Sequence, residues 1–480
     1  MNLLTLPLRL VPGSPRFTRP AAYRALASMA TAHTIQITPD NTGLWQIHQD
    51  ESAAKKASEL LQEDLEKHHV YFNHDGFHNH ISHHILSLYG TGASAEHLKR
   101  GYAENASYQR PTLKTHERVI DELKDWETAK MRVGKEQYYP DFLAFYQSEI
   151  ERLGWEKALY EYMFKGDERS EDMLSRMFAG FLHPLIQLMY GVEWKQPAMV
   201  AMGLAQAAIH QDSLGKFLLT AEKASESVSA PMPSIASLLE EVRSNEKLAT
   251  AAQMKDSNKI RDGVLTRAWD ETIAVTSRVK VKPEELDEKT AEMYHTAIYE
   301  GALAAFHQGK EPKFDFFLMH HINVCPIFIA INSQDWIPIE SKVRLLEWKI
   351  RMDLVEYAAR ACPPLSIDNI FSYVPKDKKL GPANEQLPRL FVLEDDGHAI
   401  KLFRAVGLGQ RVCEKYEDRD WTQIKGDLWT RLNHLVVDSV ESDGPRWVRG
   451  AGNSSAWKDV PDRSEVDNDG VSDKLQQVHL

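Results

Sequence analysis

The sequence predicts a mainly α-helical protein, built as a single large multi-helical bundle with a buried central site. From Glu51 onward, apolar residues return every three to four positions in long windows, which is the periodicity of helices that bury one face. Runs of alternating polarity, the usual signal of strands, are sparse, and Pro and Gly separate the periodic windows. The hydrophobic fraction of 43% is ordinary for a chain with a large core.

The predicted helices cover most of the chain between residues 45 and 440, which we expect to form the catalytic domain. In chain order they span residues 52–70, 79–89, 95–102, 139–152, 173–190, 196–210, 259–275, 283–307, 314–331, 341–361, 398–416 and 421–440. Breaks are expected at 224–233 and 363–388, where Pro, Ser and charged residues gather. Residues 443–480 are polar and rich in Gly, Ser and Asp, and are expected to be a polar C-terminal tail.

Charge and apolar patterning exclude several classes of protein. The chain has 57 Lys and Arg against 69 Asp and Glu, a formal net charge of −12, and no basic stretch, which argues against nucleic-acid binding. No window of about 18 uncharged apolar residues occurs, so no membrane span is expected. The cysteines, Cys325, Cys362 and Cys413, are too few and too scattered for a disulfide framework.

The first 28 residues differ from the rest of the chain. They contain four arginines, and the first acidic residue of the sequence is Asp40. This composition is typical of a mitochondrial transit peptide. Met29 would equally serve as a start, leaving residues 1–28 as a dispensable extension. Because the leader is only weakly amphipathic, we expect a cytoplasmic protein.

Histidine is the strongest anomaly of the sequence. Of 20 histidines, seven fall between residues 68 and 84, close to the start of a predicted helix. His80 and His84 lie four positions apart, on the side of that helix expected to face inward. A neutral imidazole is a common metal ligand and a general acid or base near neutral pH.

Further histidines occupy strongly apolar windows, where an unpaired imidazole is costly. They are His183, His210, and the adjacent His320 and His321. A single one of them is most simply a hydrogen-bonded core residue. Several helices that each bring an inward histidine are typical of a metal site inside a helical bundle, and copper, iron, manganese and zinc all accept imidazole.

A lysine within an apolar helical face adds to this pattern. Lys349 shares a face with Leu345, Leu346 and Met352, and lysine is rarely buried without a partner. An ion pair within the helix is the ordinary explanation. Alternatively, burial depresses its pKa, so that the neutral amine acts as a base or reacts with carbon dioxide to give a carbamate that binds metal.

The sequence contains no nucleotide-binding motif in the strand–turn–helix context that such a motif requires. The run from Gly90 to Ala95 matches a loose GxGxxA, yet it follows an amphipathic helix rather than a strand, so we interpret it as a helix C-cap and turn. The sequence contains no Walker loop, HExxH or GxSxG motif. A nicotinamide or flavin cofactor would therefore not be held by a recognisable Rossmann fingerprint.

Several segments together resemble the questin oxidase-like family. The resemblance is carried by residues 77–93 and 102–111, by Gly180–Ile186 with Tyr190–Glu193, by Gln206–His210, by Asp315–His320 and by Trp348–Leu354. These segments occur in the family order across about residues 45–440. The resemblance implies an oxygenase of fungal polyketide metabolism that opens the quinone ring of a hydroxyanthraquinone with molecular oxygen, with the net outcome of a Baeyer-Villiger insertion. It also implies NADPH as a reductant.

With oxygen chemistry implied and no thiolate available, Fe(II) becomes the expected metal. We expect His80, His183, His210 and His320 as ligands, with Lys349 as a further ligand or a base. His84 and His321 are expected to orient the ligands, because ligating imidazoles need their second nitrogen held. The expected walls for a flat aromatic substrate are Phe181, Tyr190, Trp194, Phe316 and Phe317.

Two alternatives remain open from the sequence. His210 and Asp212 could be a fragment of a metal-dependent phosphohydrolase site, although paired aspartates next to histidine are missing. The chain could also be a non-enzymatic helical interaction protein whose inward histidines only pack. Metal content separates these hypotheses, since iron favours the oxygenase, zinc or manganese the hydrolase, and no metal the scaffold.

Overall fold

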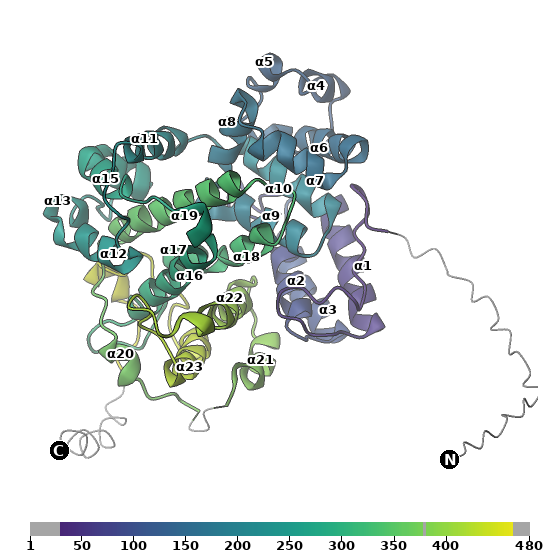
Figure 1. Ribbon diagram of the computed structural model, residues 1–480. Helices are drawn as coiled ribbons and strands as arrows, with labels where there is room; N and C mark the ends of the chain where they lie inside the picture. The colour runs from purple at the N-terminus through teal and green to yellow at the C-terminus, as the bar shows by residue number, and fades with distance from the viewer. Residues whose placement is uncertain (1–28, 378–380, 464–480) are drawn as a thin grey trace, which may run out of the picture.

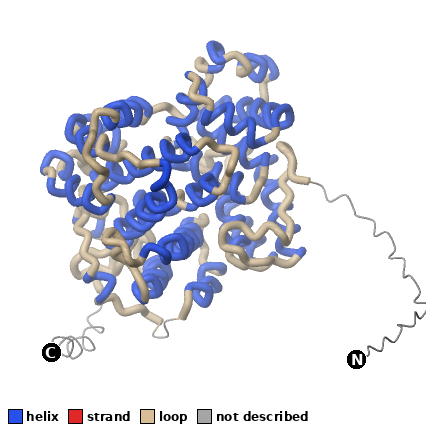
Figure 2. Tube along the Cα trace, viewed as in Figure 1, coloured by secondary structure: helices blue, strands red, loops and turns tan. Residues whose placement is uncertain are grey.

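The computed structural model describes residues 29–377 and 381–463, and this part of the chain is almost entirely helical. Its extended pairings are limited to isolated bridges, and Figure 2 shows no strand within these ranges. The prediction of a mainly α-helical protein in one bundle is confirmed. The leader prediction concerns residues 1–28, which lie outside the described residues, as do 464–480 of the predicted tail.

The helices follow one another along the chain with short connections. The α-helices of the first half are α1 (Glu51–Lys67), α2 (Ile81–Gly90), α3 (Ala95–Ala106), α4 (Glu117–Glu122), α5 (Trp126–Ala129), α6 (Tyr139–Leu153), α7 (Trp155–Leu159), α8 (Glu168–Met177), α9 (His183–Glu193), α10 (Pro197–Ile209), α11 (Gly215–Ser225) and α12 (Ile235–Ser244). Those of the second half are α13 (Glu246–Ala249), α14 (Leu265–Arg267), α15 (Trp269–Thr276), α16 (Leu286–Leu303), α17 (Phe316–Asn323), α18 (Pro326–Asn332), α19 (Ile339–Ala359), α20 (Asp368–Phe371), α21 (Ala383–Phe391), α22 (His398–Cys413) and α23 (Asp427–Glu441). Short 3₁₀ or π turns are η1 (Glu136–Tyr138), η2 (Tyr160–Phe164), η3 (Gly180–Leu182), η4 (Lys259–Val264), η5 (Pro283–Glu285), η6 (Glu414–Tyr416) and η7 (Ser454–Trp457).

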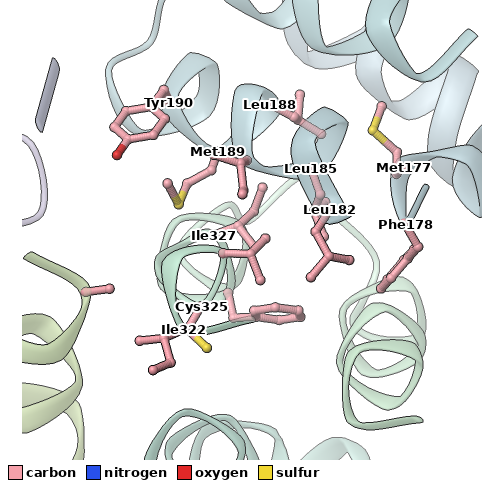
Figure 3. Packing of buried hydrophobic residues seen from close by; sticks show 14 of the residues in the cluster. Met177, Phe178, Leu182, Leu185, Leu188, Met189, Tyr190, Ile322, Cys325 and Ile327 are labelled. Carbon is pink, nitrogen blue, oxygen red and sulfur yellow. The ribbon is translucent and has the colours of Figure 1, made fainter. Parts of the chain in front are cut away.

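The helix pair α9 and α10 forms the middle of the bundle (Figure 1). Nearly every residue of both helices is buried, which explains their apolar sequences. Gly203 permits their close approach, because a Cβ at this position would lie only 3.0 Å from backbone atoms of Leu188. Figure 3 shows Met189 of α9 beside Ile327 of α18 in the main apolar core.

The predicted helix over residues 173–190 is wrong as a single helix. The chain leaves α8 at Met177 and enters α9 at His183, and Gly180, Phe181 and Leu182 have φ values of 54°, 54° and 67°. Left-handed backbone cannot continue a right-handed helix. Pro184 stands in the first turn of α9, where its missing N–H costs no hydrogen bond. This break is what brings His183 to the start of a helix.

The predicted helix over residues 314–331 is likewise divided, into α17 and α18. Pro326 starts α18, and because proline has no backbone N–H it cannot donate to the carbonyl oxygen of Ile322 and continue α17. Asp315 precedes α17 as its N-cap and accepts from the backbone N–H groups of Phe317 and Leu318. The same carboxylate accepts from the N–H groups of Gly450 and Ala451.

Residues 443–463, the first part of the predicted polar tail, pack against this region. Trp457 is buried with Ala304, Leu318 and Val460 in a small apolar cluster. Among the helices of the described ranges, none has the length and apolar character needed to cross a membrane.

Candidate metal centre

Imidazoles from four separate segments converge at the centre of the bundle. His80 is the N-cap of α2, His183 and His398 begin α9 and α22, and His320 lies within α17. The Nε2 atoms of His80 and His183 are 2.9 Å apart, and those of His320 and His398 are 3.2 Å apart. The rings of His80 and His398 lie 4.5 Å apart, and those of His183 and His320 lie 4.9 Å apart. All four side chains are buried.

The Nδ1 atoms of these rings face outward and have their own acceptors. His183 donates to the carbonyl oxygen of Gly180 and His320 to that of Phe316, each over 2.6 Å. One carboxylate oxygen of Asp396 accepts a hydrogen bond from Nδ1 of His80, at 3.1 Å, and the other accepts one from Nδ1 of His398. Since a carbonyl only accepts, the Nδ1 atoms of His183 and His320 carry the protons.

The consequence is a group of nitrogen lone pairs that point at one another. In a neutral imidazole with its proton on Nδ1, Nε2 is an acceptor only. Burial lowers the pKa of His80 to about 3 and holds the pKa values of His183 and His320 well below the usual range, so neutral rings are favoured. Two facing lone pairs repel, and a cation between them converts the repulsion into coordination. The four residues therefore fit a metal ion, which needs neutral imidazoles with their second nitrogen held.

His210, a predicted ligand, lies in the next layer rather than in this group. Its Nε2 atom is 2.9 Å from that of His78, and the hydroxyl of Tyr71 lies 3.3 Å from its Nδ1. The ring of His78 stacks on His183 with centroids 3.9 Å apart. His210 thus reaches the four-imidazole group through His78 and His183, and its role as a ligand stays a prediction.

Lys349 and His321 lie in a different buried cluster. The Nζ atom of Lys349 donates to Asp353, and the Nδ1 atom of His321 lies 2.6 Å from the same carboxylate oxygen. The other ring nitrogen of His321 lies 3.8 Å from Glu356. Within the described chain, no hydrogen bond joins Lys349 to the four imidazoles. The ion pair within the helix, the ordinary explanation of Lys349, is the one observed, and the predicted roles of both residues at the metal are not supported by this geometry.

Lys401, one turn after His398 in α22, is the lysine beside the imidazoles. It is 3% exposed, and its Nζ atom has no hydrogen-bond partner among the described residues. Burial lowers the pKa of Lys401 to about 8, against the opposing charges of Asp396 and Asp395. Its own charge lowers the pKa values of His80 and His320. A buried amine without a partner is unusual and points to a functional group.

His84 supports the loop that carries the acidic residues of the site. It packs beneath Gly397, where an added Cβ would come within 2.7 Å of the His84 Cβ atom. Burial lowers the pKa of His84 to about 4. Asn105 lies against its Nδ1 atom at 3.5 Å and donates to the carbonyl oxygen of Asp395. This arrangement fits the predicted orienting role, which acts on the position of Asp396.

The predicted aromatic walls fall into two groups. Phe181 and Phe317 line a cavity of about 200 Å³, with ring centroids 4.7 Å apart, and Phe316 lies between that cavity and His320. Tyr190 and Trp194 are 1% exposed and lie in packed core, Tyr190 bonded to Ser87 at 2.6 Å. The geometry supports a substrate-binding role for the first group.

Sequence reasoning missed His398, Asp396 and Lys401. His398 stands at the first position of a predicted helix, and its nearest sequence neighbours include two aspartates and a glycine. The available signal was the combination of Asp395, Asp396 and His398 within four residues, which is a ligand-rich spacing. The turn at Gly90 to Ala95, in contrast, is the helix C-cap that the sequence predicts, with Gly92 at φ 103°.

Comparison with known proteins identifies the family of this chain. Residues 77–406 match the model of the family described as questin oxidase-like. The chain belongs to the questin oxidase-like family. A Baeyer-Villiger oxidase of Pestalotiopsis fici is 34% identical over 441 residues, covering 90% of this chain and 99% of the relative. A questin oxidase of Aspergillus fumigatus is 33% identical over 447 residues, covering 90% and 100% of the two chains.

Family membership decides between the classes left open by the sequence. The chain is an oxidoreductase, of the oxygenase type that serves secondary metabolism in these fungal relatives. The alternative of a non-enzymatic interaction protein is wrong. The predicted resemblance is confirmed over most of the chain.

The left-handed turn before His183 leads us to expect that Gly180 cannot be replaced without loss of stability. A Cβ there would come within 2.5 Å of Cε1 of His210 and 3.0 Å of Cε1 of His78, at a φ of 54°. We expect Gly180→Ala to destabilise the fold by about 2 kcal/mol or more, since the left-handed conformation alone costs 1–2 kcal/mol and the clash adds to it. Urea denaturation measures this, together with bound metal, which we expect to fall.

Gly309→Ala is the matched control. Gly309 also has a positive φ, of 72°, but an added Cβ would meet nothing within 4 Å. The Gly309→Ala variant should lose only the stability that the left-handed conformation costs an alanine, and its bound metal should be unchanged. Equal losses in the two variants would contradict the packing of Gly180 against the histidines.

Proposed function

We propose that the chain is a non-haem iron oxygenase that opens the quinone ring of a hydroxyanthraquinone with molecular oxygen. The observation that carries this is the convergence of the Nε2 atoms of His80, His183, His320 and His398 with every Nδ1 held outward. The names of the relatives support the substrate class and the outcome, since they include questin oxidases and Baeyer-Villiger oxidases. A bound Fe(II) supplies the one-electron chemistry by which molecular oxygen is activated.

The residues around this centre divide the remaining tasks. Phe181 and Phe317 bind the flat face of the substrate, and Phe316 positions it against His320. Asp396 holds His80 and His398 in the tautomer that leaves Nε2 free. The four imidazoles are themselves buried, which limits the access of water to them.

Lys401 takes the two roles that the sequence suggested for Lys349. Its free Nζ atom can accept the proton of a substrate hydroxyl, which makes the ring electron-rich, or react with carbon dioxide to give a carbamate ligand. Burial lowers the pKa of Lys349, but the charge of Asp353 outweighs this and raises the pKa, so the amine stays protonated and is unsuited to either role. The assignment rests on the missing hydrogen-bond partner and on the position of Lys401 one turn from His398.

Replacing each of the two lysines with methionine in turn tests this assignment. Lys401→Met is expected to lower kcat/KM by roughly 100-fold, the usual effect of removing a proton-transfer group, with little change in thermal stability. Lys349→Met removes the partner of Asp353 and is expected to lower stability instead. Steady-state kinetics and thermal denaturation of both variants separate the roles, and intact mass under carbon dioxide identifies a carbamate. Loss of activity only in Lys349→Met would return the role to that residue.

The reaction itself is tested with the full chain purified and loaded with Fe(II). Aerobic incubation with a panel of hydroxyanthraquinones should give a product that gains one oxygen atom and one water, the composition of a ring-opened acid. Labelled oxygen should appear in this product. Arms with and without NADPH show whether the two electrons needed per oxygen molecule come from NADPH or from a reduced hydroquinone substrate.

The phosphohydrolase alternative finds no support at Asp212. This carboxylate accepts from the backbone N–H of Gly215, the first residue of α11, at 2.7 Å, and among the described residues it has no hydrogen bond to a histidine.

A further inference from the structure

The cavity beside the metal centre has an unusual charge. The chain as a whole is acidic, with a net charge of −12. The described residues that line this cavity include Lys259, Arg360 and Arg449 and no acidic side chain. Three cations around one cavity of about 200 Å³ repel one another unless an anion joins them.

The cations are incompletely paired. Arg449 lies over the ring of Phe316 at 3.9 Å and forms no ion pair within the part of the chain that the structure describes. The Nζ atom of Lys259 meets only backbone carbonyl oxygens, at 3.2 Å or more, and burial together with Arg360 lowers its pKa. Arg360 is 2% exposed; Glu356 lies 2.8 Å from its Nε atom, yet the Nη1 atom is buried without a partner.

Aromatic rings connect these cations to the histidines. Arg360 lies over Phe317 at 4.1 Å, and Phe181, 42% exposed, completes the opening of the cavity. The ring of Phe316 lies between Arg449 on one side and His320 and His398 on the other, at 4.6 Å and 5.2 Å. A flat molecule that reaches the imidazoles along these rings therefore passes the guanidinium groups.

We propose that the cavity binds the aromatic substrate as an oxyanion. The ionised oxygen, a phenolate or carboxylate on the ring system, is held by Arg449, Arg360 and Lys259, while the rings lie against Phe181 and Phe317. Arg360, whose side chain lines the cavity, adds its guanidinium charge. This inference rests on the proposed function, because it names the charge state of that substrate and the residues that select it.

Binding of two matched probes tests the charge preference. The probes are anthraquinone-2-carboxylate and its neutral carboxamide, titrated into the iron-loaded full chain without oxygen so that no turnover occurs. We expect the carboxylate to bind at least about tenfold more tightly at low salt, with the preference shrinking at high salt. In the Lys259→Gln/Arg449→Gln double variant, the two dissociation constants should agree within about twofold.

Lys55→Gln is the control, because it removes an exposed cation of α1 that is distant in the fold. It should keep the preference unchanged. Equal binding of the two probes, binding of neither, or a preference that survives in the double variant overturns the inference. Circular dichroism and iron content are measured on every protein. A charge preference in a protein that binds no iron would contradict the proposed function but not the oxyanion site.

Discussion

Replacing His398 with alanine is expected to abolish stoichiometric iron binding. His398 supplies one of the converging Nε2 atoms, and it holds one oxygen of Asp396. Without His398, the carboxylate of Asp396 loses one of its two imidazole partners and therefore holds His80 less firmly. We expect metal affinity to fall by more than roughly 100-fold, since outer hydrogen-bond partners alone are worth 10- to 100-fold. Metal analysis after dialysis measures the effect.

Asp396→Asn gives the graded comparison for His398→Ala. An amide keeps the size of the carboxylate but cannot accept equally from both rings, so affinity should fall by about 10- to 100-fold. His295→Gln is the control for the loss of a buried imidazole, because His295 accepts from the backbone N–H groups of Gln423 and Ile424, in another part of the bundle. Iron retained in His398→Ala, or lost equally in His295→Gln, would contradict the assigned ligand set.

The largest effect on stability is expected from Glu193→Ala. Glu193 and Arg404 form an ion pair between α9 and α22, and both side chains are 1% exposed. The carboxylate also accepts from the backbone N–H of Leu44 at 2.8 Å. Its removal leaves the guanidinium charge buried without a counter-ion, which costs about 3–5 kcal/mol. Equilibrium denaturation in urea measures this loss.

Two further variants identify the cause. Arg404→Met in the Glu193→Ala background removes the unpaired charge and should recover part of the stability. Glu63→Ala breaks the exposed pair with Lys67, whose side chains are 39% and 63% exposed, and should change stability by less than about 1 kcal/mol. A loss in Glu193→Ala no larger than in Glu63→Ala would show that the buried pair does not hold α9 against α22.

Most helices could be predicted from the local apolar pattern, and the predicted helices that are wrong were interrupted by a local feature of the backbone. The windows at 196–210 and 341–361 correspond closely to α10 and α19, because the helical periodicity of each continues without an interior proline or left-handed turn. The window at 173–190 failed because periodicity does not register the left-handed turn at Gly180, which only packing against His78 and His210 stabilises. Glycine permits that turn but does not require it.

The sequence by itself determined the helical class, the family, and the kind of side chain at the centre, because helix periodicity and residue chemistry are local properties. The tertiary structure alone decided which imidazoles meet. His80 and Asp396 are 316 residues apart, His398 lies among the imidazoles, and Lys349 pairs with Asp353 in a different buried cluster. The arrangement of the imidazoles depends on the relative placement of four separate segments and on which ring nitrogen finds an acceptor, and neither is encoded within the sequence window of one helix.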